Sequence, residues 1–409
     1  MASNEFAALR RIKIVDNCLE IGGGSVVALA ERVGRTPFYV YERDELTKRV
    51  GELRHHLPAQ IKLHYAIKAN PMPEVVQHLA SLVDGFDIAS VGEMRVALAT
   101  ATPPQHISFA GPGKTREELA AAVAADIVIN VESERELDAT DQLAQEQGRV
   151  AQIAIRVNPD FELKSSGMKM SGGAKPFGID AECVPALLAQ DRWRHTQFIG
   201  LHIYCGSQNL RSTAIIEAQQ KTFELASRLL EHAPQPARWL NIGGGFGIPY
   251  FAGDEPLDLA PIGANLHKML IQYAQRLSGI EIIVELGRYI VGEAGVYICR
   301  VIDRKISRGQ VFLVTDGGLH HHLAASGNFG QVLRKNYPVI VANKAASLQR
   351  EIANVVGPLC TPLDVLADKM DMAAAEVGDL IAVMQSGAYG ATASPINFLS
   401  HPPPREILI

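Results

Sequence analysis

The stretch IKLHYAIKANPMPEVVQHLASLVDGFDIAS, residues 61–90, sets the pattern of the chain. Its first part, 61–69, is apolar and aromatic enough to predict a buried strand, and 73–82 has the apolar spacing of an amphipathic helix. The apolar segment 85–90 predicts a second strand. A strand, a helix and a strand in this order predict a parallel βαβ unit.

The same alternation continues to about residue 290. We predict eight strands, at 61–69, 85–90, 106–111, 126–133, 151–159, 198–207, 239–245 and 281–288, with helical patterns between them. Eight such units in roughly 230 residues have the size of a closed (β/α)8 barrel. Polar and glycine-rich residues follow nearly every strand, where such barrels build their sites, and this favours the barrel over an open doubly wound sheet.

After residue 290 the alternation of strands and helices gives way to short strand-like segments separated by turns. These segments predict a separate β domain. The segment TPFYVYE, 36–42, is predicted to supply a strand to that domain. We therefore expect an N-terminal segment, 1–40, that contributes to the β domain, a barrel at 41–290, and a C-terminal β domain at 291–409.

The composition narrows the classes of function. A net charge of -5 over 409 residues gives no general field for attracting nucleic acid or an anionic membrane, so a small-molecule partner is favoured. Five widely spaced cysteines favour reduced thiols, and hence the cytoplasm, over a disulfide framework. Charges near the start and the lack of a long uncharged run argue against a secreted or membrane protein.

Lys68 stands at the end of the first barrel strand, where it would face the barrel mouth. A lysine amine in a desolvated pocket is a nucleophile towards an aldehyde. The alternative is a surface lysine that simply ends the strand.

The run NIGGGFG, 241–247, can bring several backbone N–H groups close to one anion. Ser207 and Arg288 end the flanking strands, so the three together predict a phosphate cradle. A tight turn is the alternative for the glycines. Glu285 is predicted to lie opposite a pyridine nitrogen and keep it protonated, with a structural ion pair to Arg288 as the alternative.

Two further motifs carry reactive side chains. Cys360 lies in VVGPLCTPLD, a turn that could present its thiol at an interface, although most lone cysteines are inert. The histidines at 320–322 have no acidic or cysteine partners nearby at metal-ligand spacing, so we predict a polar loop near the site and no metal.

These pieces, in this order, resemble the fold type III decarboxylases that depend on pyridoxal 5'-phosphate (PLP), the diaminopimelate and ornithine decarboxylase family. The resemblance implies an alanine-racemase-like fold, which is a TIM barrel plus a β domain. The resemblance covers nearly the whole chain. The amino-acid sequences of the segments SGMKMSGGAKPFG (166–178) and FLSHPPPREIL are most similar to those of the exosortase A system-associated subgroup. The matching motifs are YAIKANP (65–71), GFDIASVGE (85–93), GSQ (206–208), GGGFG (243–247), ELGRYIV (285–291), VVGPLC (355–360) and SGAYG (386–390).

The resemblance implies roles for individual residues. Lys68 would hold PLP as a Schiff base, and Glu285 would pair with the pyridinium nitrogen. Cys360 would reach the active site of the other subunit of a homodimer and donate the proton to Cα. The other implied cofactor contacts are Asp87, Glu93, Tyr204, Ser207, Gly244, Gly245, Gly287, Arg288 and Tyr389.

Two positions depart from the family pattern. Tyr204 stands where the family has a histidine stacked on the cofactor, although His202 lies on the same strand face. Thr361 stands where diaminopimelate and ornithine enzymes carry an acid that holds the distal amine of the substrate. We assign His202 and Thr361 to substrate binding, and expect weak activity on free diamino acids.

The predicted function is PLP-dependent α-decarboxylation of an amino acid, with CO2 released through an external aldimine. A conjugated or carrier-bound amino acid is an alternative substrate. Racemisation on the same fold and a non-enzymatic regulatory protein are alternative functions. The loop at 164–178 is predicted to close over the substrate.

Overall fold

The computed structural model describes residues 6–161, 168–169, 172–190 and 192–409. Six residues of the predicted substrate loop, 164–178, therefore lie outside the described residues, namely 164–167, 170 and 171. The chain divides into two compact units. The barrel unit consists of Lys48–Gly247 and Leu257–Gly287, and the β unit consists of Met1–Thr47, Ile248–Pro256 and Arg288–Ile409.

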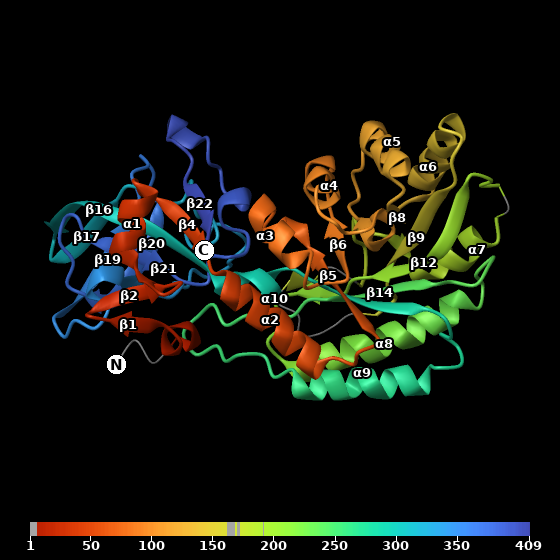
Figure 1. The fold of residues 1–409 in the computed structure, drawn as a ribbon, viewed down its shortest axis with the longest axis horizontal. Helices are drawn as coiled ribbons and strands as arrows, with labels where there is room; N and C mark the ends of the chain where they lie inside the picture. Colours follow the sequence, from red (N-terminus) through yellow and green to blue (C-terminus); the bar gives the residue numbers. More distant parts are fainter. Residues whose placement is uncertain (1–5, 162–167, 170–171, 191) are drawn as a thin grey trace. The chain divides into compact units, whose positions relative to one another are not determined.

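Eight parallel strands form the barrel (Figure 1), and all eight predicted strands are confirmed. The sheet order is β9-β12-β14-β15-β5-β6-β7-β8, and pairing of β8 with β9 closes it, so the open-sheet alternative is wrong. The bounds are β5 (Ile61–Ala66), β6 (Gly85–Ile88), β7 (Ile107–Phe109), β8 (Val128–Val131), β9 (Ala151–Asn158), β12 (Thr196–Ile203), β14 (Trp239–Gly244) and β15 (Glu281–Leu286).

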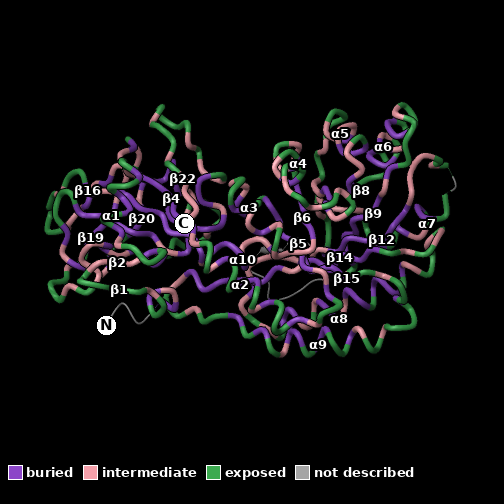
Figure 2. Tube along the Cα trace, in the orientation of Figure 1, coloured by how far each residue is buried: buried purple, intermediate pink, exposed green. Residues whose placement is uncertain are grey.

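Helices connect these strands, and Figure 2 shows mostly buried strands beside helices with an exposed face. Three of the helices begin at a serine or threonine whose side chain accepts a bond from the backbone three residues on, namely Ser90, Thr115 and Ser133. The bounds are α2 (Arg43–His56), α3 (Pro73–Leu79), α4 (Val91–Leu98), α5 (Arg116–Ala125), α6 (Glu134–Glu146), α7 (Val184–Leu188), α8 (Ser212–Leu230) and α9 (Ala260–Gln272).

An apolar layer fills part of the barrel interior. It is a cluster of buried residues from five different strands. Successive side chains on a strand point to opposite faces, so on β8, β9, β14 and β15 the residue two positions later faces the interior as well, whereas on β12 the register shifts between Phe198 and Gly200. The cluster therefore lies directly before the inward positions at the carboxyl ends of the strands. Its members are Val128, Ala154, Ile199, Trp239 and Ile283.

The β unit is built on a mixed sheet with the order β18-β21-β16-β17-β19-β20, and β4 pairs with both β16 and β22. Phe38, Val40 and Ile298 pack in its core with α1 (Val26–Val33). The sequence did not predict β20, β22 or the small sheet of β1 (Lys13–Val15), β2 (Cys18–Ile21) and β3 (Gly24–Ser25). The main bounds are β4 (Phe38–Tyr41), β16 (Gly295–Ser307), β17 (Gln310–Thr315), β18 (Val339–Val341), β19 (Arg350–Val356), β20 (Val365–Ala373), β21 (Leu380–Val383) and β22 (Arg405–Leu408).

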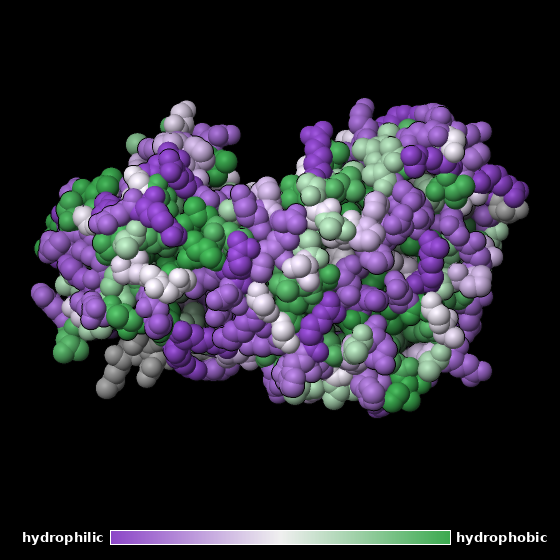
Figure 3. Space-filling model, viewed as in Figure 1, coloured by the Kyte–Doolittle hydropathy of each residue, from purple (hydrophilic) through white to green (hydrophobic). Residues whose placement is uncertain are grey.

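The surface is mixed, and polar and apolar residues are interspersed on the face shown in Figure 3. Within the described part of the chain, no helix has both the length and the apolar character needed to cross a bilayer.

Gly200 on β12 provides a test of the barrel packing. A Cβ at this position would lie 1.7 Å from the backbone oxygen of Trp239 on the neighbouring strand. We expect Gly200→Ala to lower the free energy of unfolding by more than about 2 kcal/mol, because backbone must move to admit the methyl group. Urea denaturation followed by circular dichroism measures this change.

The matched control is Gly51→Ala on α2, where a Cβ would meet no atom within 4 Å. Alanine favours the helix over glycine by about 0.5–1 kcal/mol, so this variant should be neutral or more stable. Equal effects of the two substitutions would contradict the packing argument.

Candidate active site

A layer of buried polar side chains fills the barrel directly beyond the apolar layer. Asn241 Nδ2 on β14 lies 3.5 Å from Asp87 Oδ1 on β6, and two other strands separate β14 from β6 in the sheet. This contact therefore crosses the barrel interior. Buried polar groups on this scale are costly for a purely structural core, so the layer indicates a site. Each barrel strand contributes at least one member: His64, Asp87, Ser108, Asn130, Arg156, His202, Asn241 and Glu285.

Lys68 lies in a 3-10 turn, η3 (Ile67–Ala69), directly after β5. Its Nζ donates to Glu285 Oε1 at 3.3 Å and lies 5.7 Å from the ring centroid of Tyr204. The side chain of Lys68 is 41% exposed, whereas that of Glu285 is 3% exposed. The amine is thus accessible to an incoming aldehyde while its carboxylate partner is buried.

Glu285 on β15 is held at both carboxylate oxygens. Its Oε2 lies 3.2 Å from His202 Nε2 and 3.4 Å from Asn241 Nδ2. Burial alone would raise the pKa of Glu285, but the charge of Lys68, the hydrogen bond from His202 and the charges of His202 and Arg156 together lower it far below its ordinary value. Glu285 is therefore ionised at neutral pH.

Several buried polar side-chain atoms of this layer have no hydrogen bond among the described residues. Asp87 Oδ1 accepts a short hydrogen bond from Ser108 Oγ, but Asp87 Oδ2 has no hydrogen bond among the described residues. The same is true of His64 Nδ1 and of both polar side-chain atoms of Asn130. Buried polar groups are nearly always satisfied in proteins, so orphan atoms gathered in one layer indicate a place where a polar ligand binds.

Close backbone contacts require glycine in the loop after β14. A Cβ on Gly244 would lie 2.2 Å from Glu285 O, and one on Gly245 would lie 2.1 Å from Gly206 O. Gly206 and Ser207 form β13, so this loop and the GSQ motif are packed together. Only glycine permits this approach, and it leaves backbone donors near one another, as an anion site needs.

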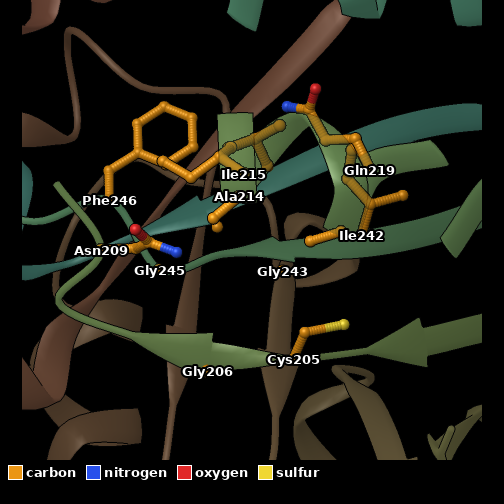
Figure 4. A pocket seen from close by; sticks show the side chains of 13 residues that line it. Cys205, Gly206, Asn209, Ala214, Ile215, Gln219, Ile242, Gly243, Gly245 and Phe246 are labelled. Carbon is orange, nitrogen blue, oxygen red and sulfur yellow. The ribbon is translucent and has the colours of Figure 1, made fainter. Parts of the chain in front are cut away.

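A small cavity of about 30 Å³ adjoins the glycine loop within the barrel unit (Figure 4). The sulfur of Cys205 lines it together with side chains from α8 and Ile242 of β14. Nothing in the sequence pattern singled out Cys205. Its apolar neighbours are consistent with a packing role.

Glu93 follows β6 on the first turn of α4, and its Oε2 accepts from the backbone N–H of Ala89 at 2.7 Å. Burial raises the pKa of Glu93, and the hydrogen bond from Ala89 and the charge of Lys68 offset this only in part. Glu93 is therefore within electrostatic range of Lys68.

Four charged side chains form a buried cluster at the ends of β7 to β9. Arg156 Nη1 donates to Glu132 Oε1 at 2.6 Å, and Lys114 Nζ donates to Glu136 Oε1 at 2.5 Å. Burial would raise the pKa of Glu132, but the charges of Arg156 and Lys114 outweigh it and lower the pKa. Lys114 precedes α5 (Arg116–Ala125) and Glu136 is on α6 (Glu134–Glu146), and the sequence did not single out either residue.

Arg288 and Tyr389 lie in the β unit. Arg288 begins α10 (Arg288–Val291), and its Nη1 donates to Tyr250 Oη at 2.9 Å. Its guanidinium lies 4.7 Å from the ring centroid of Tyr389, which has a φ of 54°. Arg288 Nε is buried and has no hydrogen bond among the described residues, so one donor of this cation is left for an anion.

Cys360 and Thr361 lie in the turn between β19 and β20 of the β unit. The carboxylate of Asp364 fixes this turn by accepting from the backbone N–H of Leu359 at 2.8 Å and of Leu319 at 2.5 Å. Cys360 is exposed, and Thr361 Oγ1 accepts from the N–H of Leu363 at 3.3 Å. The turn thus presents the thiol on the surface of the unit.

The three histidines lie in a turn of the β unit, in line with the predicted loop, but they are buried. His322 Nε2 lies 2.9 Å from Ser386 Oγ, and His321 Nε2 lies 2.9 Å from the backbone oxygen of Pro402. Burial lowers the pKa of His322 to about 3 and that of His321 to about 4. Neutral imidazoles can occupy a core, and the sequence pattern cannot show this.

Comparison with known proteins identifies the family. Residues 43–292 match the family described as pyridoxal-dependent decarboxylase, pyridoxal binding domain. The chain belongs to the pyridoxal-dependent decarboxylases. The decarboxylase is 37% identical over 397 residues to the L-glutamyl-[BtrI acyl-carrier protein] decarboxylase of Niallia circulans, a match covering 95% of this chain and 92% of the relative.

Two diaminopimelate decarboxylases are also similar. The enzyme of Aquifex aeolicus is 33% identical over 397 residues, covering 96% of this chain and 91% of the relative. The crystal structure of the enzyme from M. jannaschii has a TM-score of 0.86 at 26% identity, covering 98% of this chain and 93% of that one. The chain is therefore a PLP-dependent amino-acid decarboxylase, a carboxy-lyase, with the predicted TIM barrel and β domain.

The residues of the barrel unit fit the cofactor. They offer an accessible amine on Lys68, an ionised Glu285, orphan polar atoms and a glycine loop suited to a phosphate. Gly287 packs against the lysine motif, since its Cβ would lie 2.9 Å from that of Ala69. Of the predicted site residues, the barrel unit contains Lys68, Asp87, Glu93, His202, Tyr204, Ser207, Gly244, Gly245, Glu285 and Gly287, and the β unit contains Arg288, Cys360, Thr361 and Tyr389.

The buried charge cluster gives a pH-dependent prediction. Glu132→Gln should lower the free energy of unfolding by about 3 kcal/mol at pH 7, because it leaves Arg156 buried without its anion. The pKa of Glu132 is lower in the folded state, so its contribution is present above the unfolded value of about 4.3 and is lost as the pH falls through the folded value.

The difference between wild type and Glu132→Gln should therefore shrink below about pH 4, as measured by urea denaturation at a series of pH values. Glu146→Gln is the control, because Glu146 and Arg116 form a pair with side chains 48% and 49% exposed. Such a pair contributes at most about 1 kcal/mol. A difference for Glu132→Gln that grew on acidification would contradict the argument.

Proposed function

We propose that this decarboxylase removes the α-carboxylate of an amino acid that is conjugated or bound to a carrier, rather than of a free diamino acid. The observation that carries the proposal is Thr361, an uncharged residue where enzymes for diamino acids have an acid. Its hydroxyl is already engaged by the backbone of Leu363. The similarity to a decarboxylase of a carrier-bound glutamyl group supports the same substrate class.

In this proposal Lys68 holds PLP, and the cofactor supplies an electron sink for the bond to the carboxylate. Glu285 places a fixed negative charge opposite the ring nitrogen. Cys360 donates a proton to Cα of the substrate in the partner subunit of a homodimer. The relatives named above are decarboxylases, which supports decarboxylation over racemisation.

The remaining cofactor contacts are proposals of the same kind. Asp87, Glu93 and Tyr204 would surround the reactive end of the cofactor. Ser207, Gly244, Gly245 and Gly287 would bind its phosphate through the packed glycine loop. For Arg288 and Tyr389 the proposal rests on the motif resemblance and on the orphan Nε of Arg288.

The cellular location of the enzyme and its subgroup within the family are proposals as well. We place the enzyme in the cytoplasm because its cysteines are few and it forms no disulfide among the described residues. The amino-acid sequence of residues 166–178 supports membership of the exosortase A system-associated subgroup.

Lys68→Ala tests the cofactor linkage. The variant should lose the visible absorbance that borohydride reduces, because no amine remains to bond to the cofactor aldehyde. Absorbance spectra before and after reduction, with peptide mapping of the reduced wild type, measure this. Lys62→Ala, on strand β5 that precedes the Lys68 turn, is the control. Retention of the reducible band by Lys68→Ala would overturn the assignment.

A CO2-release screen tests the substrate class. We expect carrier-bound or conjugated amino acids to be decarboxylated with a kcat/KM at least about tenfold above that of meso-diaminopimelate, lysine or ornithine, because an unpaired distal ammonium is costly to desolvate. Robust turnover of free meso-diaminopimelate would refute the proposal.

Thr361→Asp is the matched variant for this screen. A carboxylate at this position should raise kcat/KM for the free diamino acids and leave that for conjugated substrates unchanged or lower. If the substitution had no effect on this ratio, Thr361 would not be the residue that sets the preference.

A further inference from the structure

The two oxygens of the Glu285 carboxylate face different partners. Oε1 faces the Lys68 amine at 3.3 Å, and Oε2 faces His202 Nε2 at 3.2 Å. A carboxylate only accepts hydrogen bonds, so His202 Nε2 carries the hydrogen of this contact. His202 and Glu285 are both buried, with side chains 2% and 3% exposed. The contact is therefore screened from water.

The Lys68 ammonium cannot stabilise the ionised carboxylate of Glu285 while the amine holds the cofactor. Under the proposed function that amine is then occupied, and the ammonium beside Oε1 is gone. A buried carboxylate that loses a cationic partner tends to take up a proton. Glu285 must nevertheless stay negative to keep the ring nitrogen protonated. Its ionisation then depends on its other neighbours.

His202 gives the shorter of the two contacts that remain at Oε2. Asn241 Nδ2 lies 3.4 Å away, and its direction is fixed because Asn241 Oδ1 accepts from the N–H of Gly243 at 2.8 Å. The same Nδ2 lies 3.5 Å from Asp87 Oδ1, so it is shared between two carboxylates. His202 has no such competing contact: its Nδ1 is buried and has no hydrogen bond among the described residues.

The other charged or titratable groups near Glu285 come from three further strands of the barrel, β9, β6 and β5. Arg156 on β9 contributes a favourable charge, but its Nη1 is paired with Glu132. Asp87 on β6 shares Asn241 Nδ2 with Glu285. His64 lies opposite Glu285 in the β15–β5 register, and its Nδ1 is 3.6 Å from Asp87 Oδ2. His202 is thus the titratable neighbour whose hydrogen bond is directed at Glu285 alone.

We propose that His202 is a positioning residue that keeps Glu285 ionised and oriented while Lys68 holds the cofactor. This inference rests on the proposed roles of Lys68 and Glu285. It replaces the substrate-binding role that the sequence assigned to His202. His202 acts through Glu285 and need not touch the substrate.

The first test uses protein without cofactor. In Lys68→Ala without cofactor, both the amine and the ring nitrogen are absent, so the contribution of His202 to Glu285 is measured without either of them. Carbon-13 labelling of glutamate side chains, with Glu285→Gln to assign the signal, follows its protonation by NMR. Adding His202→Leu to Lys68→Ala should raise the pH at which Glu285 titrates by at least about one unit.

His202→Gln is the conservative variant, because its amide can donate a hydrogen bond in place of Nε2. It should restore most of the wild-type titration in the same background. If His202→Leu left the Glu285 titration unchanged while circular dichroism showed a folded protein, the proposal would be overturned. If His202→Gln gave the same shift as His202→Leu, the effect would be one of packing, and the proposal would fail as well.

The second test uses the enzyme with PLP. The visible absorbance of His202→Leu should become pH-dependent in a range where that of wild type is constant. In a Glu285→Gln background, His202→Leu should cause no further change, because no carboxylate is left to hold. An equal change in both backgrounds would show a role independent of Glu285.

The two tests separate this inference from the proposed function. If Glu285→Gln alone left the spectrum unchanged, the proposed role of Glu285 at the cofactor would fall. If Glu285→Gln changed the spectrum and His202→Leu did not, only the positioning role of His202 would fall.

Discussion

The site depends on a negative charge held inside the barrel. Glu285 is buried, and burial alone would favour its neutral form, yet its neighbours reverse this and lower its pKa. The reversal requires donors from several strands at once, since Lys68 follows β5, His202 is on β12 and Asn241 is on β14. A closed barrel is suited to this task because it brings side chains from distant strands to one axis.

The same constraint explains how the interior is arranged. An apolar cluster occupies one level, and a polar layer follows it two residues later on four of its five strands. Val128, Trp239 and Ile283 thus precede Asn130, Asn241 and Glu285, respectively. Beyond the polar layer, Gly244 and Gly245 allow the backbone to come closer than any side chain would permit. Packing, charge and anion binding are therefore separated along the axis of the barrel.

Much of this could be predicted from the sequence, because the predicted features are local. The eight strands are short apolar segments, and Lys68 and Glu285 stand directly at or beside the ends of two of them. The sequence did not reveal β20, in which the charged residues Asp368, Lys369 and Asp371 interrupt the alternation and Lys369 has a φ of 47°. It did not reveal β22 either, a four-residue strand whose partner β4 lies at the other end of the chain.

Contacts between distant segments were beyond a local pattern for the same reason. Nothing in the sequence relates Asn241 to Asp87, or Lys114 to Glu136, until the barrel closes. His202 was placed on the correct strand, but its partner, 83 residues away, could not be identified. The sequence therefore predicts which residues reach the site, and the fold is needed to show which of them act on each other.

The orphan polar atoms of the barrel layer have a thermodynamic consequence. Asp87 Oδ2, His64 Nδ1 and both polar side-chain atoms of Asn130 are buried without a hydrogen bond among the described residues, and each such group weakens the folded state until something satisfies it. A ligand that binds only the native barrel adds stability by mass action, about 2.7 kcal/mol at a hundredfold excess over its Kd. The supply of cofactor in the cell would then govern how much of this protein persists, as well as how fast it works.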